Sequence, residues 1–279
     1  MSLSIRFWGV RGSCPTPGPE TALVGGNTSC IEVVAGATRI ALDAGTGLRK
    51  LGAHLLAQPR GPVDLTVLLS HVHWDHIQGL PFFAPIYIPG TRLVVAGGAT
   101  GTPLADTLRR QMSAPTFPVD WKDLPAAREY VDMRDGIPTR LGEAEVRTAR
   151  ANHPDAVFAY RVEHEGSSIV YATDTEHYAC VDPRLVALSR DADVLVYDAQ
   201  YLPEEYGGKV GWGHSTFEAG AALARAAGVR KLVLFHHDPA RTDADVEGIE
   251  RRAREVFDDV VAAREGMTIE LGRSSSIAA

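Results

Sequence analysis

Four residues that commonly bind metal ions lie within one six-residue segment of this 279-residue chain: His71, His73, Asp75 and His76. The segment follows the apolar run Leu65–Leu69, which predicts that it begins where a β-strand ends. Side chains two residues apart in extended backbone point the same way, so His71 and His73 can converge on one metal ion. If the chain then bends, Asp75 and His76 can face a second ion close by. Imidazole and carboxylate ligands suit zinc, manganese or iron.

Short apolar runs rich in β-branched residues recur along the chain, and each predicts a strand. The predicted strands are Leu3–Trp8, Ser29–Ala35, Arg39–Leu42, Leu65–Leu69, Arg92–Ala96, Val157–Val162, Ser168–Ala172, Val194–Tyr197, Lys231–Phe235 and Met267–Leu271. Helices are expected after Thr46, near Thr102, over 215–228 and over 243–260. In the third helix, Ser215 and Glu218 form a capping box. Strands precede helices in both halves, so we expect a layered α/β architecture.

The composition is that of a folded globular protein, with 45% hydrophobic and 23% charged residues. Its net charge of −7 would repel phosphate backbones, which argues against a dedicated duplex-DNA binder.

Three cysteines are too few for a disulfide framework. The sequence contains no apolar run of the roughly 18 residues that span a bilayer, and its first residues lack the features of a signal peptide. We therefore expect a cytoplasmic protein with no membrane partner.

The segment His71-Val-His73-Trp-Asp75-His76 resembles the signature of the metallo-β-lactamase superfamily, and further motifs follow in the expected order. They are Asn152-His153-Pro154, Thr173-Asp174-Thr175 and Leu234-Phe235-His236, so the resemblance covers essentially the whole chain. It implies a four-layer αβ/βα sandwich, the metallo-β-lactamase fold, with a metal site at the sandwich edge. We expect residues 1–279 to form one such domain, with the proline-rich segment 81–138 as an elaboration over the active face.

The resemblance also implies two sets of metal ligands. One ion would be held by His71, His73, His153 and Asp174. The other would be held by Asp75, His76, Asp174 and His236. The expected cofactors are two divalent ions, zinc first, with manganese or iron as alternatives. His237 adjoins His236 and stays open as the alternative ligand, whereas Asp43 resembles a residue that supports the metal loop by hydrogen bonding.

Trp212-Gly213-His214-Ser215-Thr216 resembles the His-Ser-Thr motif of the ribonuclease Z and cyclic-phosphate phosphodiesterase branch. Beside a helix N-terminus, His214 can donate to a phosphoryl oxygen or protonate the leaving group. The expected catalytic residues are therefore Asp75, which would orient the nucleophile, and His214. The expected substrate contacts are Arg11, His214 and Ser215, although a role as N-cap is the preferred explanation of Ser215.

The predicted function is that of a dinuclear metal-dependent hydrolase, a phosphodiesterase that cleaves a small or cyclic phosphodiester with a metal-bound hydroxide. Only twenty residues separate His153 from Asp174, which leaves no room for the RNA-binding arm of ribonuclease Z. No long nucleic acid is therefore expected as a partner. A hydrolase of thioesters, lactones or sulfate esters and a non-catalytic metal-binding member in cofactor biosynthesis stay open as alternatives. A homodimer also stays open.

Overall fold

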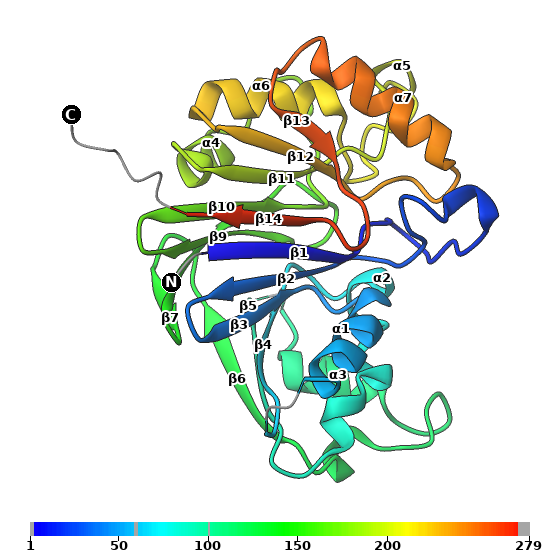
Figure 1. The fold of residues 1–279 in the computed structure, drawn as a ribbon, viewed down its shortest axis with the longest axis vertical. Coiled ribbons are helices and arrows are strands. Elements are labelled where there is room, and N and C mark those ends of the chain that lie inside the picture. The colour runs from blue at the N-terminus through cyan, green and yellow to red at the C-terminus, as the bar shows by residue number, and fades with distance from the viewer. Residues whose placement is uncertain (1–2, 59–60, 100, 273–279) are drawn as a thin grey trace.

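The computed structural model describes residues 3–58, 61–99 and 101–272. Its strands form two seven-stranded sheets (Figure 1). The strands of the first sheet are β1 (Leu3–Gly9), β2 (Cys30–Ala35), β3 (Thr38–Leu42), β4 (Asp64–Leu69), β5 (Arg92–Gly98), β6 (Ala127–Met133) and β14 (Thr268–Leu271). The strands of the second sheet are β7 (Thr139–Leu141), β8 (Ala144–Arg150), β9 (Phe158–His164), β10 (Ser167–Ala172), β11 (Val194–Asp198), β12 (Lys231–Phe235) and β13 (Val260–Ala262).

Helices cover the outer faces of both sheets. The α-helices are α1 (Gly47–Leu56), α2 (Trp74–Ile77), α3 (Leu104–Gln111), α4 (Pro183–Ser189), α5 (Pro203–Tyr206), α6 (Phe217–Ala227) and α7 (Asp243–Arg254). Short 3-10 helices cover Pro19–Thr21, Leu80–Phe82, Ala84–Tyr87 and Trp121–Asp123. In Figure 1, α4, α6 and α7 lie on the side of the second sheet, and α1 and α3 lie on the side of the first. Within the described part of the chain, no helix has both the length and the apolar character needed to cross a membrane.

Three hydrophobic clusters hold these four layers together. One cluster joins the facing sides of the two sheets, a second lies between the first sheet and α1 and α3, and a third lies between the second sheet and α4, α6 and α7. In β4, Leu65, Val67 and Leu69 belong to the helix side, whereas Leu68 belongs to the inter-sheet cluster. This follows because alternate residues of a strand point to opposite faces of the sheet. The fold is the predicted αβ/βα sandwich, so the predicted fold class is confirmed.

Both sheets change from antiparallel to parallel pairing partway across. In the first sheet β3 to β6 are parallel, and in the second sheet β10 to β13 are parallel. The carboxyl ends of parallel neighbours lie at the same edge of a sheet, which is where α/β proteins place binding residues. The residues that follow β3, β4, β10 and β12 are those that the sequence analysis singled out.

The structure corrects two predicted helix boundaries. The helix predicted over 243–260 ends at Arg254, because Val260 begins β13, which pairs with β12. The N-cap of α6 is Thr216 rather than Ser215, since the Thr216 side chain accepts a hydrogen bond from a backbone N–H of the first turn. Two adjacent hydroxyl residues compete for this position, and only the backbone geometry distinguishes them.

The segment 81–138 is more than an elaboration over the site. It contributes β5 and β6, which extend the first sheet to its edge. Four strands, β6, β7, β8 and β13, are not predicted from the sequence. The residues of β6 are largely polar and mostly exposed or half-buried, so this edge strand lacks the apolar pattern on which the prediction depended.

Candidate metal centre

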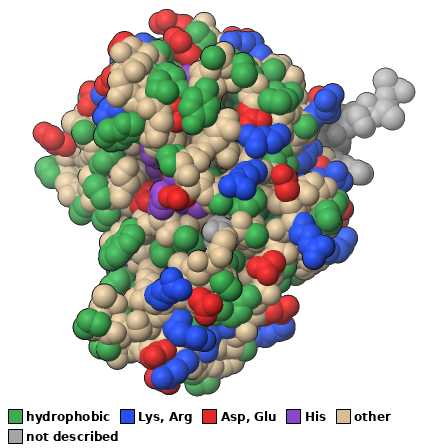
Figure 2. Space-filling model, turned by 180° about the vertical axis from the view of Figure 1, so that it is seen from behind, with side chains coloured by type: hydrophobic (Ala, Val, Ile, Leu, Met, Phe, Trp, Pro, Cys, Tyr) green, Lys and Arg blue, Asp and Glu red, His purple; other side chains and the backbone are tan. Residues whose placement is uncertain are grey.

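The residues predicted to bind metal converge at one edge of the sandwich. Their donor atoms form two groups, and within each group all of these atoms lie within 4.8 Å of one another. The first group is His71, His73 and His153, and the second group is Asp75, His76, Asp174 and His236. The second group is buried, whereas His73 and His153 are partly exposed. Figure 2 shows histidine side chains at the surface midway along the molecule. The partial exposure of His73 and His153 means that the cluster opens to solvent.

Three residues at this edge have positive φ angles: Asp43 (60°), Asp174 (50°) and His236 (60°). Asp43 and His236 come directly after β3 and β12, and Asp174 comes two residues after β10. This backbone conformation costs a residue other than glycine about 1–3 kcal/mol, and it clusters at functional sites. It bends the chain sharply at the strand end, which lets these side chains meet between the sheets. The surrounding fold therefore stabilises a strained backbone where the two sheets converge.

The buried carboxylate of Asp43 fixes the loop that follows β4. It accepts hydrogen bonds from the Ser70 N–H (2.7 Å), the Ser70 hydroxyl (2.8 Å), the Tyr171 hydroxyl (2.7 Å) and His76 Nδ1 (2.7 Å). Because a carboxylate only accepts, His76 Nδ1 carries a proton and Nε2 is the atom left for a metal. The Ser70 hydroxyl donates to Asp43, so it accepts from His71 Nδ1 at 3.0 Å. Both imidazoles therefore carry a proton on Nδ1 and leave Nε2 for a metal, which agrees with a supporting role of Asp43.

His236, like His76, has its Nδ1 bonded to an acceptor oxygen, whereas the partly exposed residues His73 and His153 both bond to Asp155. His236 Nδ1 donates to Gln200 Oε1 at 2.8 Å, which leaves Nε2 for the second group. In the first group, the Asp155 N–H donates to His153 Nδ1 (3.2 Å), and the Asp155 carboxylate accepts from His73 Nε2 (2.8 Å). Asp155 is an exposed residue, so the open half of the cluster depends on a surface side chain.

Two buried nitrogen atoms of the cluster, His71 Nε2 and His76 Nε2, have no hydrogen-bond partner among the described residues. His71 Nε2 lies 3.7 Å from Asp174 Oδ1, and His76 Nε2 lies 3.1 Å from Asp75 Oδ2 and 3.3 Å from Asp174 Oδ2. Buried polar atoms without a partner are rare, and these two converge with carboxylate oxygens. Imidazole and carboxylate donors without thiolate suit zinc and related divalent ions. The residues present therefore fit divalent metal ions.

The pKa shifts of the cluster agree with a site for divalent metal ions. Burial lowers the pKa of His71 well below its usual value, and the nearby His76 lowers it further, so the His71 ring is neutral. Burial also acts to lower the pKa of His76, but the carboxylates of Asp75, Asp174 and Asp43 raise it well above its usual value. Burial acts to raise the pKa of Asp75 and of Asp174, yet the surrounding histidines lower both. The second group therefore stabilises positive charge at its centre.

His237 and Arg11 lie outside the cluster. Burial lowers the pKa of His237 to about 3, and its Nε2 donates to the Ala263 carbonyl at 3.0 Å. His236, not His237, is therefore the histidine that faces the other donors.

The Arg11 side chain is completely buried, and its expected contact with substrate stays a prediction. The Arg11 guanidinium donates to three backbone carbonyls: those of Gly25, Asp238 and Arg241.

Asp198 at the end of β11 positions His214 beside the second group. Its Oδ2 accepts from His214 Nδ1 (2.9 Å) and from the Asp174 N–H (3.0 Å), and its Oδ1 accepts from the Ser215 N–H (3.2 Å). Burial acts to lower the pKa of His214, but Asp198 raises it to about 9. The His214 and His236 rings stack with centroids 4.9 Å apart. The role of Asp198 is not predicted from the sequence, although its place at the end of the apolar run 194–197 is a signal for it.

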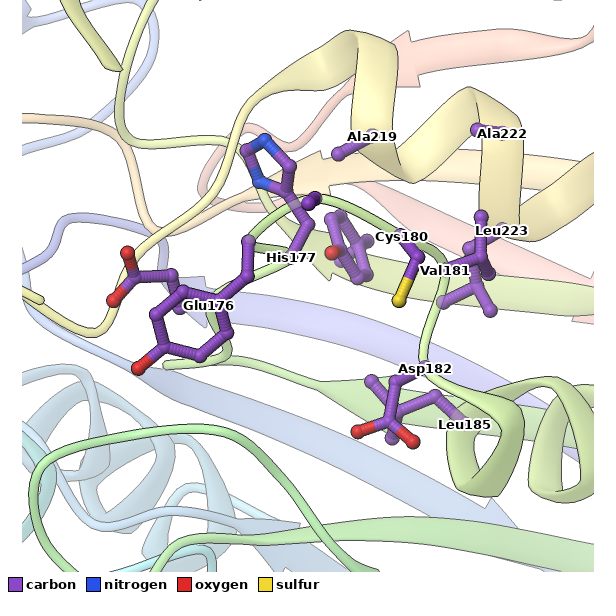
Figure 3. Close-up of a pocket in the computed structure, with 12 residues that line it drawn as sticks. Glu176, His177, Cys180, Val181, Asp182, Leu185, Ala219, Ala222 and Leu223 are labelled. Atoms are coloured by element: carbon purple, nitrogen blue, oxygen red, sulfur yellow. The ribbon is translucent and has the colours of Figure 1, made fainter. Parts of the chain in front are cut away.

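Ser215 is buried, and its hydroxyl bonds to His177 Nδ1 (2.8 Å) and the Tyr197 hydroxyl (3.0 Å). These partners hold the hydroxyl within the protein, and the expected contact of Ser215 with substrate stays a prediction. His177 and Tyr197 also line a pocket of about 190 Å³ between the segment 176–182 and α6 (Figure 3). Figure 3 shows Glu176 and His177 at one end of this pocket and Leu223 at the other. None of the seven predicted ligands lines it.

The fold and the donor cluster together define a metal-binding αβ/βα sandwich. Residues 38–237 match the family model of the β-lactamase superfamily domain, so the chain belongs to this superfamily. It is similar to ribonuclease Z of Methanosarcina acetivorans, 34% identical over 148 residues that cover 53% of this chain and 44% of that relative. The chain thus spans less than half the length of that relative.

Two further similarities extend over nearly the whole chain. Ribonuclease Z of Methanopyrus kandleri is 27% identical, over 97% of this chain and 99% of the relative. The crystal structure of YhfI from Bacillus subtilis, a metallo-β-lactamase fold protein, superposes with a TM-score of 0.73 at 20% identity. That superposition covers 96% of this chain and 99% of YhfI, and it supports the fold.

These relatives overturn one expectation from the sequence. The exclusion of a long nucleic acid partner is wrong, because a relative named ribonuclease Z aligns over nearly the full length of both chains. The net charge of −7 is a property of the whole chain and does not describe the surface beside the metal cluster. The short interval between His153 and Asp174 forms the β9–β10 hairpin, and the lack of an arm in this interval does not exclude RNA.

Replacing Asp43 tests whether it orients the metal ligands. The substitution Asp43→Asn keeps the shape of the side chain but replaces one acceptor oxygen with a donor, so the bonds to Ser70 and His76 cannot all form. We expect the affinity for zinc to fall about 10–100-fold, as it does when residues that orient metal ligands are lost. Competition with a chelator measures this affinity. Asp64→Asn, at the exposed start of β4, is the control, and equal zinc affinity in both variants would contradict the role of Asp43.

Proposed function

We propose that this protein is a phosphodiesterase that uses two divalent metal ions, with zinc as the expected metal. The placement of Asp174 carries the proposal. Asp174 Oδ1 faces His71 Nε2 of the first group at 3.7 Å, and Oδ2 faces His76 Nε2 and His236 Nε2 of the second group, each at 3.3 Å. A carboxylate between two sets of imidazoles is suited to hold two ions close together. Membership of the superfamily and relatives named ribonuclease Z support a phosphodiester as the bond that is cleaved.

The proposed ligands are the seven residues of the two groups. When bound, a pair of divalent ions lowers the pKa of water and offsets negative charge on a phosphoryl group. The chain itself fixes the carboxylate of Asp75, because the Ser13 N–H donates to Asp75 Oδ2 at 2.8 Å. This contact brings the loop after β1 to the cluster. Asp75 is therefore held in place to bind metal and to orient the attacking water molecule.

His214 is the proposed proton donor. Its Nδ1–H donates to Asp198, which in turn is held by the backbone N–H groups of Asp174 and Ser215. This carboxylate stabilises the protonated ring, so His214 Nε2 carries a proton as well. That proton can bond to a phosphoryl oxygen or pass to the leaving oxygen. His214 is thus a catalytic residue in this proposal, and Asp198 is a positioning residue.

The proposal names the bond that is cleaved, a phosphodiester. Two kinds of molecule contain such a bond. A small or cyclic phosphodiester is the substrate that the sequence analysis favoured. The names of the relatives add RNA to the candidates. Hydrolysis of bis(p-nitrophenyl) phosphate, of 2′,3′- and 3′,5′-cyclic nucleotides and of an RNA with a 3′ extension ranks these candidates in one experiment. Failure to cleave any of them by the zinc-loaded protein would contradict the proposed function.

The substitution Asp174→Ala tests the two-ion site. We expect the hydrolysis of bis(p-nitrophenyl) phosphate to fall on the order of 100-fold or more, because one carboxylate supports both ions. We also expect the zinc content, measured by plasma mass spectrometry, to fall below that of the unaltered protein. Asp191→Ala is a matched control, since Asp191 is an exposed aspartate that also has a positive φ angle (51°). Full zinc content and full turnover in Asp174→Ala would rule out the assigned role.

The substitution His214→Gln separates proton donation from metal binding. The atoms of Asp198, His214 and His236 also lie within 4.8 Å of one another, so His214 can be read as a metal ligand. If it is a proton donor, kcat falls about 10²–10⁴-fold while the zinc content stays unchanged. Steady-state kinetics and metal analysis of the same preparation measure both. A loss of zinc together with the loss of kcat would instead make His214 a ligand.

A further inference from the structure

The tryptophans of this chain divide into two buried and two exposed residues. Trp8 and Trp121 are 8% and 3% exposed, whereas Trp74 is 78% and Trp212 is 60% exposed. Both exposed tryptophans are close in sequence to residues of the candidate site. Trp74 stands between two of the proposed ligands, and Trp212 stands two residues before His214. Large aromatic side chains contribute to stability when they are buried, so two exposed indoles that adjoin site residues in the chain are candidates for a role in binding.

The backbone around Trp212 is fixed on both sides. The N–H groups of Gly211 and Gly213 both donate to the carboxylate of Glu176, at 2.8 Å and 3.1 Å. The Tyr206 hydroxyl donates to the same carboxylate at 2.9 Å. Glu176 is 1% exposed, and Figure 3 shows it at the end of the pocket beside α6. A buried carboxylate with three donors thus holds the loop of an exposed tryptophan in one position, which is a preorganised arrangement rather than a loose surface loop.

The chain neighbours of the two indoles, Gly213 and His73, lie beside or belong to the same pair of imidazole rings. Gly213, next to Trp212, packs so closely on His153 that a Cβ atom there would lie 2.1 Å from His153 Cδ2. The ring of His153 in turn lies 5.1 Å from the ring of His73, which directly precedes Trp74. His73 and His153 are the partly exposed part of the cluster. The backbones that carry Trp212 and Trp74 therefore flank the partly exposed side of the cluster.

A cation accompanies one of these indoles. Lys209 Nζ lies 4.3 Å from the ring centroid of Trp212 and 5.6 Å from that of Tyr201. A cation over an aromatic ring is attracted by the negative face of the ring, so the ammonium group is held near the site. An ammonium group beside an aromatic surface is the combination with which proteins bind single nucleotides and single-stranded nucleic acid.

We propose that Trp212 and Trp74 form a stacking subsite for a nucleobase, with Lys209 contributing positive charge for phosphate. The inference rests on the proposed function in one respect: the base belongs to the phosphodiester whose phosphoryl group lies at the metal cluster. Stacking on an indole tolerates every base, because each has a π-face. The preferred substrates are therefore nucleoside phosphodiesters rather than phosphodiesters of simple alcohols.

Two esters with the same leaving group test the subsite. Thymidine 5′-(p-nitrophenyl phosphate) carries a base, and methyl p-nitrophenyl phosphate does not. We expect the unaltered protein to prefer the thymidine ester, and the ratio of the two kcat/KM values to fall about tenfold in Trp212→Ala and in Trp74→Ala, mainly through KM. Trp212→Phe retains an aromatic face and should keep most of the preference. Ile137→Ala, an exposed apolar residue between β6 and β7, is the control and should leave the ratio unchanged.

Binding of product-like ligands separates the subsite from the proposed reaction. By calorimetry, AMP should bind the zinc-loaded protein about tenfold more tightly than ribose 5-phosphate, and Trp212→Ala should remove this difference. If neither ester is hydrolysed but AMP keeps this advantage, the reaction is wrong and the subsite stands. If both esters are hydrolysed equally well and AMP has no advantage, the subsite is overturned and the reaction stands. If AMP has no advantage and nothing is hydrolysed, both fail.

A last comparison identifies the source of the base. A 2′,3′-cyclic nucleotide and a short single-stranded oligoribonucleotide are tested as inhibitors of the hydrolysis of the thymidine ester. The tighter inhibitor shows whether a mononucleotide or RNA supplies the base, and in either case its inhibition constant should rise about tenfold in Trp212→Ala. An inhibition constant that is the same in Trp212→Ala would overturn the subsite.

Discussion

The candidate site depends on the buried carboxylate of Asp43. This residue follows β3 of the first sheet, and it accepts a hydrogen bond from Tyr171 in β10 of the second sheet. Its other bonds, to Ser70 and His76, fix the loop after β4 that supplies four of the proposed ligands. A buried carboxylate without partners would be strongly destabilising, whereas one with four donors is stable and rigid. Asp43 thereby sets the spacing between ligands from the two sheets.

The same arrangement recurs at the ends of other strands. Asp198 ends β11 and holds His214, and Gln200, two residues later, holds His236. In each case a polar group at or just past the end of a buried strand orients an imidazole ring from a neighbouring element. The strained φ angles of Asp43, Asp174 and His236 belong to this arrangement, because a sharp turn directly after a strand directs the side chain into the space between the sheets. The hydrophobic clusters between the layers stabilise the fold against this strain.

The sequence predicted those parts of the molecule that depend on local pattern. The strand runs and the His71 to His76 segment were recognised because an apolar run followed directly by metal-binding residue types is a short-range signal. The more distant His153, Asp174 and His236 were added by their resemblance to family motifs, and the structure brings them to the same edge. The sandwich architecture followed from the same resemblance and is confirmed.

The features that the sequence did not predict depend on tertiary contacts. Glu176 and Gly213 are 37 residues apart, and nothing near either of them indicates that they bond. Arg11 has the charge of a phosphate ligand, but its burial against backbone carbonyls is decided by the path of distant loops. The choice between Ser215 and Thr216 as N-cap depends on backbone angles. The edge strand β6 is polar because much of it faces solvent, so it lacks a hydrophobic pattern.

A crystal structure of the zinc-loaded protein, with anomalous diffraction measured at the zinc absorption edge, tests the central claim most directly. Our account predicts two anomalous peaks. One peak should lie among His71, His73 and His153, the other among Asp75, His76 and His236, with Asp174 in contact with both. A single peak, or a zinc ion bound by Asp198, His214 and His236, would contradict the account, because Asp174 would then not join two metal ions.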